Sequence, residues 1–187
     1  MQKPRSDLRP NTADYETTPL VKATGFREYD ARWVLEKEIN LLGIQALGLG
    51  LATYVHEIGQ TPRIVVGHDF RSYSLSVKQA LTLGLLEGGM EVVDIGLALS
   101  PMAYFAQFEL DCPCVAMVTA SHNENGWTGV KMGANPPLTF GPDEIGRLKE
   151  IVLNGEGVGR AGGTLTRVED FRERYIADSV AKTAARL

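Results

Sequence analysis

The stretch RIVVGHDFRSYSLSVKQALTLGLLE, from Arg63 to Glu87, decides the fold class of this sequence. It begins with a short β-branched run over residues 63–67, which is typical of a buried strand that ends at a glycine. A polar loop follows, and residues 75–87 then have the apolar spacing of a helix. Strand, loop and helix in this order form the repeating unit of parallel sheets that are covered by helices.

The same alternation continues on both sides of this unit. Helices are predicted over residues 41–58, 100–109 and 142–153, and strands over residues 90–95, 114–119 and 127–132. Ser100 and Pro101 supply an N-cap and a first-turn proline for the second of these helices. The pattern predicts an α/β fold whose mostly parallel sheet has helices on both faces.

Both ends of the chain differ from this pattern. Residues 1–20 are polar, lack the apolar run of a signal peptide and are expected to form a loose arm. The glycine-rich stretch NGEGVGRAGG, residues 154–163, is expected to be a connector near a domain boundary. After it, a helix over residues 169–186 is predicted, without a further strand. We therefore expect an arm (1–20), a domain (21–155), and a linker with the possible start of a second domain (156–187).

Composition excludes several classes of function. Of the 187 residues, 44% are hydrophobic, and 23 acidic and 19 basic side chains give a net charge of −4 without a basic block. We therefore expect no nucleic-acid partner. The longest uncharged run, residues 39–55, is too short and too polar to span a bilayer, so we expect no membrane contact and a cytoplasmic location. Cys112 and Cys114 are predicted to be reduced, buried thiols.

A binding site is expected in the loops that follow the predicted strands. Ligands gather at the carboxyl ends of parallel strands, which here means the loops after Val66, Ile95 and Thr119. The first of these loops begins with HDFR, residues 68–71. Its aspartate and arginine fit an ion pair that fastens the loop as well as they fit a functional role.

The loop after Thr119 has the richest chemistry of the three. Turn and cap bonding would explain Ser121 and Asn123, because both residue types bond to nearby backbone amides. Such bonding does not explain His122, the two glycines that follow the loop, or Lys131 in the next predicted strand. This loop is therefore the main candidate for a functional site.

Three other kinds of site fit the sequence less well. Ser121 beside His122 would suit a serine hydrolase, but no G-x-S-x-G elbow surrounds the serine, and neighbours in sequence rarely point at each other. Gly48-x-Gly50 lacks the third glycine of a dinucleotide site and lies in a helical pattern, which favours helix packing. The sequence contains no G-x-x-x-x-G-K-[ST], so a P-loop is excluded.

Four segments of the chain resemble, in order, the motifs of one family. Residues 119–131, TASHNENGWTGVK, are similar to the active-site serine loop of the α-D-phosphohexomutases, the phosphoglucomutase and phosphomannomutase family. GFREYDAR (25–32), VGHDFRSYS (66–74) and DIGLALSP (94–101) resemble other motifs of that family. The resemblance covers residues 21–155 and implies a three-layer α/β/α domain with a mostly parallel mixed sheet, the first domain of such enzymes.

The resemblance implies an isomerase that interconverts hexose 1-phosphate and hexose 6-phosphate. Ser121 would carry a phosphate, donate it to a hexose phosphate and take back the other phosphate of the reoriented bisphosphate. Hexose 1,6-bisphosphate would then be both intermediate and activator. A Mg²⁺ ion would bind through the phosphate on Ser121.

The same resemblance assigns the other expected site residues. Lys131 would stabilise charge or transfer a proton, and His122 would orient the hydroxyl or the phosphate. Tyr29, Arg32 and Asn123 would bind the substrate, and the planar guanidinium of Arg32 suits a phosphate group.

Two positions and the length of the chain depart from the family pattern. Glu124, where proline is common, adds negative charge near a phosphate, and Trp33 in place of glycine leaves the backbone less free. Members of the family have four domains, so we expect an N-terminal part of a mutase that needs the missing C-terminal domains and is inactive alone. The alternative is a short non-catalytic protein that keeps the fold to bind sugar phosphates or a partner. The sequence does not identify the hexose.

Overall fold

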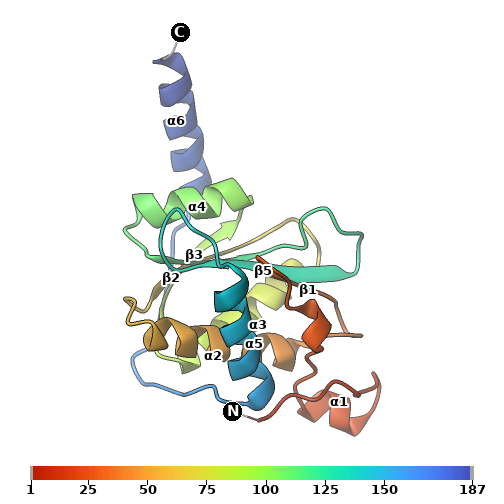
Figure 1. The fold of residues 1–187 in the computed structure, drawn as a ribbon. Coiled ribbons are helices and arrows are strands. Elements are labelled where there is room, and N and C mark those ends of the chain that lie inside the picture. The colour runs from red at the N-terminus through yellow and green to blue at the C-terminus, as the bar shows by residue number, and fades with distance from the viewer. Residues whose placement is uncertain (1, 186–187) are drawn as a thin grey trace.

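A computed structural model describes residues 2–185, which form a mixed sheet with helices on both faces (Figure 1). The strands lie in the order β1-β5-β4-β2-β3-β6. Their bounds are β1 Ala31–Val34, β2 Arg63–His68, β3 Glu91–Leu97, β4 Cys114–Val118, β5 Trp127–Gly133 and β6 Thr164–Arg167. The helices are α1 Ala13–Thr17, α2 Leu41–Glu57, α3 Ser74–Glu87, α4 Ser100–Glu109, α5 Pro142–Asn154 and α6 Phe171–Ala184, with a short 3₁₀ turn, η1, at Ala23–Gly25.

The direction of the strands brings the expected functional loops to one edge of the sheet. Strands β2, β3, β4 and β6 run parallel, while β5 is antiparallel to both of its neighbours, β4 and β1. The β2–β4 pairing runs from Ile64 opposite Cys114 to His68 opposite Val118, so the two strands end side by side. The predicted α/β class with a mostly parallel mixed sheet is confirmed.

Two buried clusters join the helices to the two faces of the sheet. The larger lies on the side of α2, α3 and α5 and includes Leu47, Leu81 and Leu148, all fully buried. The smaller lies on the side of α4 and the first turn of α6, and includes Met102 and Phe171. Figure 1 shows these two groups of helices on opposite sides of the sheet. Burial of apolar surface on both faces therefore produces the predicted three layers.

Strands β1 and β6 were not predicted from the sequence. All four residues of β6 are exposed, so their side chains carry no buried alternation. Backbone pairing with β3, from Glu91 opposite Thr164 to Asp94 opposite Arg167, makes this segment a strand. The expectation that no strand follows the glycine-rich connector is therefore wrong.

The segment after residue 155 runs along the end of α3 before it joins the sheet. Arg160 N–H donates to the carbonyl of Glu87 at 2.8 Å. The last predicted helix is present as α6, and its expected end at Arg186 lies outside the described residues. The division between residues 155 and 156 stays a prediction. Within residues 2–185, none of the helices has the length and apolarity needed to cross a bilayer.

The N-terminal segment packs against the domain, which corrects the expectation of a loose arm. Leu8 and Leu20 are buried, and Arg5 pairs with Leu20 in an isolated bridge. Asn40, the N-cap of α2, accepts from Leu20 N–H at 2.9 Å and donates to the carbonyl of Tyr15 at 3.1 Å. Because these bonds depend on contacts between distant residues, the polar composition of the segment did not reveal them.

Helices α2 and α3 approach each other closely at two glycines. A Cβ on Gly48 would lie 2.3 Å from the carbonyl oxygen of Leu81, and one on Gly84 would lie 2.0 Å from that of Gln45. Any larger residue at these positions would collide with the backbone of the other helix. The prediction that Gly48 serves helix packing is confirmed.

The two cysteines have no disulfide. Cys112 and Cys114 are both free and buried. Burial raises the pKa of each thiol to about 12. At such a pKa the reactive thiolate is scarce at neutral pH, which agrees with the predicted buried thiols.

Candidate active site

The serine loop, residues 119–126, connects the carboxyl end of β4 to the antiparallel strand β5. Thr119 N–H donates to the carbonyl of Gly129 at 2.9 Å, so the chain reverses at once. Ser121 has a φ of 55°, in the left-handed region, where a non-glycine residue costs about 1–3 kcal/mol. Gly126, with a φ of 94°, makes the second bend, in a conformation that glycine adopts easily. The loop therefore holds Ser121 in an unfavourable conformation that other contacts must stabilise.

The carboxylate of Asp69, from the neighbouring β2–α3 loop, lies at the centre of those contacts and is 6% exposed. It accepts from Ser74 Oγ at 2.6 Å and forms an ion pair with Arg71, and the side chain of Thr119 also helps to lower its pKa. Burial alone would raise the pKa of Asp69, but these hydrogen bonds and the charge of Arg71 leave its pKa below the ordinary value. Asp69 is therefore ionised at neutral pH.

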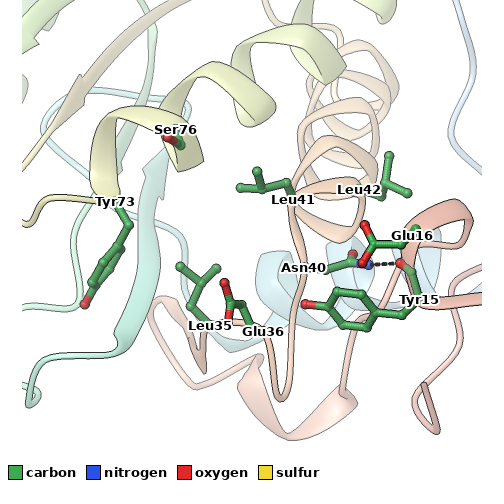
Figure 2. A pocket seen from close by; sticks show the side chains of 9 residues that line it. All are labelled: Tyr15, Glu16, Leu35, Glu36, Asn40, Leu41, Leu42, Tyr73 and Ser76. Atoms are coloured by element: carbon green, nitrogen blue, oxygen red, sulfur yellow. Dashed lines mark hydrogen bonds between the residues drawn. The ribbon is translucent and has the colours of Figure 1, made fainter. Parts of the chain in front are cut away.

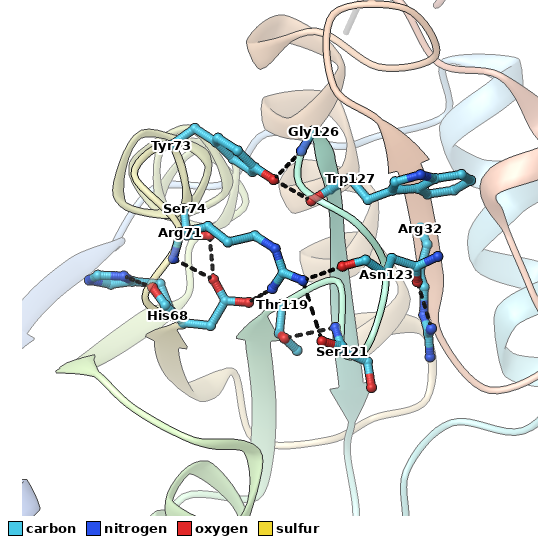
Figure 3. Close-up of polar contacts among 11 residues, drawn as sticks. Arg32, His68, Arg71, Tyr73, Ser74, Thr119, Ser121, Asn123, Gly126 and Trp127 are labelled. Atoms are coloured by element: carbon cyan, nitrogen blue, oxygen red, sulfur yellow. Dashed lines mark hydrogen bonds and ion pairs between the residues drawn. The ribbon is translucent and has the colours of Figure 1, made fainter.

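Arg71 extends from the β2–α3 loop to the serine loop. Its Nη2 donates to the carbonyl of Asn123 at 2.7 Å and to that of Ser121 at 3.3 Å (Figure 3). Ser121 N–H donates to Thr119 Oγ1 at 3.0 Å. In Figure 3 the Ser121 side chain points away from the guanidinium of Arg71, so its hydroxyl is not used in these bonds. The Asp69–Arg71 pair thus fastens its own loop and the serine loop together.

Tyr73 fixes the end of the serine loop. Its hydroxyl accepts from Gly126 N–H at 2.8 Å and donates to the carbonyl of Trp127, also at 2.8 Å (Figure 3). The bond of a single hydroxyl to two successive peptide units restricts the bend at Gly126.

A second carboxylate, Asp30, brings two expected site residues together. Its Oδ2 lies 2.6 Å from Arg32 Nη2 and 3.3 Å from Lys131 Nζ. Arg32 Nη1 donates to Asn123 Oδ1 at 2.9 Å, which joins this cluster to the serine loop. The side chains of Arg32 and Lys131 are 24% and 26% exposed, so a ligand can reach both. Two cations and one carboxylate leave an excess positive charge, which suits a phosphate.

The other two expected site residues lie at the surface. Tyr29 is 58% exposed, and His122 is exposed next to Ser121 in the serine loop. The structure therefore joins Arg32 to Asn123 directly and to Lys131 through Asp30, and it leaves the side chains of Tyr29 and His122 open to solvent.

Sequence reasoning missed several residues that shape this region. Asp30, Tyr73 and Thr119 all lie within the quoted motifs, but their roles depend on which strands are neighbours. Tyr104 on α4 is also close to Asp30: burial, and then the charge of Asp30, raise the pKa of its hydroxyl. Nothing in the sequence around Tyr104 indicates this proximity. For Asp30, Tyr73 and Thr119, the one indication in the sequence was that they lie in motifs that meet at the same edge of the sheet.

The two departures from the family pattern have different surroundings. Trp33 is fully buried in β1, its Nε1 donates to the carbonyl of Lys22 at 2.8 Å, and its ring covers Gly25, where a Cβ would lie 1.9 Å from the ring. The bulk of Trp33 is thus part of the core. Glu124 is exposed in the serine loop, where its charge is screened by solvent.

A cavity of about 410 Å³ lies beside this region, between α1 and the starts of α2 and α3 (Figure 2). It is lined by Tyr15, Glu16, Leu35, Glu36, Asn40, Leu41, Leu42, Tyr73 and Ser76. Because this lining contains none of the expected site residues and includes two carboxylates, it does not suit a phosphate.

The expected Mg²⁺ ion finds few ligands in the described part of the chain. No group of three or more His, Cys, Asp or Glu side chains within residues 2–185 is placed to hold a metal. Ser121 supplies one oxygen, whereas Mg²⁺ prefers six oxygen ligands in octahedral geometry. These residues alone therefore do not fit a complete magnesium site.

The geometry defines a class of protein: an α/β/α domain that presents a serine in a left-handed turn, close to two cations that share one carboxylate. Residues 23–157 match the family described as phosphoglucomutase/phosphomannomutase, alpha/beta/alpha domain I. The chain therefore belongs to the phosphoglucomutase/phosphomannomutase family.

Known proteins similar to this chain agree with that assignment. A probable phosphoglucosamine mutase of Pyrococcus furiosus is 40% identical over 106 residues, which are 57% of this chain and 23% of the relative. A phosphomannomutase of Escherichia coli is 36% identical over 113 residues, 60% of this chain and 24% of the relative. The crystal structure of a phosphoglucomutase/phosphomannomutase family protein from Burkholderia thailandensis matches with a TM-score of 0.76 at 24% identity and covers 84% of this chain and 35% of that one. This last likeness concerns the fold. The chain thus spans about a quarter of the length of the two curated relatives.

Proposed function

We propose that this chain is the serine-bearing domain of a phosphohexomutase, which interconverts hexose 1-phosphate and hexose 6-phosphate. The observation that carries the proposal is the serine loop, in which Ser121 has a left-handed conformation and Asn123 accepts from Arg32. Family membership supports the same reaction class, because both curated relatives are named as hexose or hexosamine phosphate mutases.

Each transfer exchanges one oxygen–phosphorus bond for another. The bond between Ser121 Oγ and phosphorus breaks while a hydroxyl oxygen of the hexose phosphate bonds to the phosphorus. The hydroxyl proton replaces the phosphoryl group on Ser121 Oγ, so the products are a free serine and a hexose bisphosphate. After the bisphosphate reorients, its other phosphate returns to Ser121 by the reverse step. Phosphate therefore moves between the 1- and 6-hydroxyls without net change in the protein.

The polar side chains close to the serine loop have distinct proposed roles. Lys131 stabilises the charge of the transferring phosphoryl group or passes the proton, and its contact with Asp30 supports a fixed position for the ammonium. Arg32 binds phosphate through its planar fork, with Asn123 as its neighbour. His122 orients the Ser121 hydroxyl or its phosphate, and Tyr29 contacts the sugar at the mouth of the site.

The proposal includes a metal ion and further polypeptide. When bound to the Ser121 phosphate, Mg²⁺ would neutralise charge on the phosphoryl oxygens. Its other ligands would come from the missing C-terminal domains, in line with relatives about four times as long as the matched segment. Hexose 1,6-bisphosphate would serve as activator, and we place the enzyme in the cytoplasm.

The product of the complete gene tests this proposal. We expect it to convert hexose 1-phosphate to hexose 6-phosphate in a coupled assay, and the Ser121→Ala variant to lose turnover while binding hexose phosphate. Turnover that survives the substitution would contradict the phosphoserine role. Binding of hexose phosphate without turnover in the parent would instead favour the non-catalytic alternative, a domain that keeps the fold to bind sugar phosphates.

A further inference from the structure

Both backbone groups of Ser121 bond to side chains that lie beside the carboxylate of Asp69. Ser121 N–H donates to Thr119 Oγ1 at 3.0 Å, and the side chain of Thr119 is close enough to Asp69 to help lower the pKa of its carboxyl group. The carbonyl of Ser121 accepts from Arg71 Nη2 at 3.3 Å, and Nη1 of the same guanidinium is paired with Asp69. One buried carboxylate on the β2–α3 loop thus lies beside both side chains that bind the backbone of Ser121.

The position of Asp69 is itself fixed by the sheet and by α3. Its N–H donates to the carbonyl of Val118, the last residue of β4, at 3.0 Å. Ser74 Oγ, at the start of α3, donates to its carboxylate at 2.6 Å. A charged acceptor held by the sheet and by α3 can therefore help to set the conformation of the serine loop.

We infer that Asp69 is a positioning residue that acts through Thr119 and Arg71 to keep Ser121 in its left-handed conformation, with Oγ presented for phosphoryl transfer. The inference rests on the proposed function for its catalytic consequence. The conformational part does not depend on that function. Phosphoryl transfer requires the attacking and leaving oxygens in line, so a loop that samples other conformations presents Oγ correctly only part of the time.

Thr119 allows the sharpest test, because the chain offers a matched control. Thr53 on α2 is another buried threonine whose hydroxyl donates to one oxygen, that of Leu49 at 2.8 Å, and accepts one backbone N–H, that of Val158 at 2.9 Å. Thr119→Val and Thr53→Val therefore each remove a hydroxyl that accepts one backbone N–H, the first at the serine loop and the second on helix α2. Thr119→Ser keeps the hydroxyl and serves as the rescue variant.

The first readout is amide hydrogen exchange by NMR in the 187-residue chain. We expect Thr119→Val to speed exchange at Ser121 about tenfold, Thr53→Val to speed it at Val158 and leave Ser121 unchanged, and Thr119→Ser to resemble the parent. Unchanged exchange at Ser121 in Thr119→Val would overturn the inference. Equal acceleration at Ser121 in Thr53→Val would do so as well, because the effect would then reflect overall stability.

The second readout is the rate at which glucose 1,6-bisphosphate phosphorylates Ser121, followed by intact mass. We expect a loss of about tenfold or more in Thr119→Val, with parental rates in Thr53→Val and Thr119→Ser. A Thr119→Val chain that accepts phosphate at the parental rate would contradict the inference. A parent that accepts no phosphate, as a separate chain and within the product of the complete gene, would count against the proposed function, and the exchange measurement would still decide the inference.

A second variant covers the case in which Thr119→Val does not fold. Arg71→Lys can keep an ion pair with Asp69 but lacks the planar fork that reaches Ser121 and Asn123 at the same time. We expect it to fold, to exchange faster at residues of the serine loop and to accept phosphate more slowly. Parental behaviour in both measurements would overturn the inference.

Discussion

At the scale of single residues, the cationic side chains beside the serine loop outnumber the carboxylates that pair with them. One oxygen of Asp30 is shared by Arg32 and Lys131, at 2.6 Å and 3.3 Å. Because one carboxylate cannot neutralise two cations, a net positive charge remains beside the loop. The second carboxylate, Asp69, is already paired with Arg71 and buried, so it does not cancel that charge. A phosphate on Ser121 would complete the balance.

Removal of Lys131 tests this balance. We expect Lys131→Ala to accept phosphate from hexose 1,6-bisphosphate at least about tenfold more slowly than the parent, because one of two available cations is lost. Its melting temperature should change little, since the side chain is 26% exposed. The time course of intact mass measures the rate, with Lys149→Ala on α5 as the control. Equal rates in the two variants would remove Lys131 from the site.

The pH dependence of stability tests the state of Asp69. Burial alone would raise its pKa. The bonding of Ser74 and Thr119 and the charge of Arg71 together outweigh burial, so the pKa lies below its ordinary value of 3.8. The unfolded chain therefore binds this proton at a higher pH than the folded one. The ionised carboxylate stabilises the fold above the unfolded-state pKa, and that contribution is lost as the pH falls through the folded-state pKa.

We accordingly expect Asp69→Asn to be less stable than the parent at neutral pH and to lose less stability on acidification. Urea unfolding at about pH 7, about pH 5 and about pH 3 shows how the free energy of unfolding changes with pH in the parent and in the variant. A variant whose stability falls as steeply as that of the parent below about pH 4 would contradict the assigned ionisation.

At the scale of elements, the close approach of α2 and α3 requires glycine at two positions. Gly48 and Gly84 each face a backbone carbonyl of the other helix, at Cβ distances of 2.3 Å and 2.0 Å. The rest of α2 is apolar over most of its circumference, because α3, α5 and the sheet surround it. This close contact sets the position of α3 and, through Ser74 at its start, of Asp69.

A pair of glycine substitutions separates close packing from helix propensity. We expect Gly84→Ala to lower the free energy of unfolding by about 1–3 kcal/mol, because its Cβ would overlap the backbone of α2. Gly146→Ala on α5, where a Cβ meets open space, should raise it by up to about 1 kcal/mol. Urea unfolding measures both. If Gly84→Ala were stabilised as well as Gly146→Ala, α2 and α3 could move apart without loss of stability, and the close contact would not matter.

The elements that the sequence predicted are those whose side chains carry the pattern. Helix α2 and strand β2 are buried by their own apolar residues, so periodicity and β-branched runs identified them. Strand β6 forms by backbone pairing with β3, and the chain at α1 is held by a hydrogen bond from the side chain of Asn40. Neither element therefore has an apolar pattern in its own sequence. Local sequence does not record pairing between distant segments.

The candidate site, too, could be predicted only in part from the sequence. Ser121, Arg32 and Lys131 were expected from a resemblance of motifs, and the structure places the last two on one carboxylate. The contact of Arg71 with the serine loop could not be predicted, because it requires β2 and β4 to end side by side. The left-handed φ of Ser121 was equally hidden, since serine seldom adopts it.

At the scale of the whole molecule, the sheet brings motifs from distant parts of the chain to one edge. The protein has a net charge of −4, so attraction of a phosphate depends on the local cations and not on the overall field. The described domain corresponds to about a quarter of the length of its curated relatives. In our proposal, transfer of phosphate to the serine needs only this domain and a donor, whereas complete turnover needs the rest of the enzyme.

The most direct test of the account is the phosphorylation state of Ser121. The 187-residue chain and its Ser121→Ala variant are incubated with hexose 1,6-bisphosphate and Mg²⁺, and intact mass and peptide mapping follow. The account predicts one phosphoryl group on Ser121 in the parent and none in an equally stable variant. A parent that stays unmodified, as a separate chain and within the product of the complete gene, or a phosphate located on another residue, would contradict it.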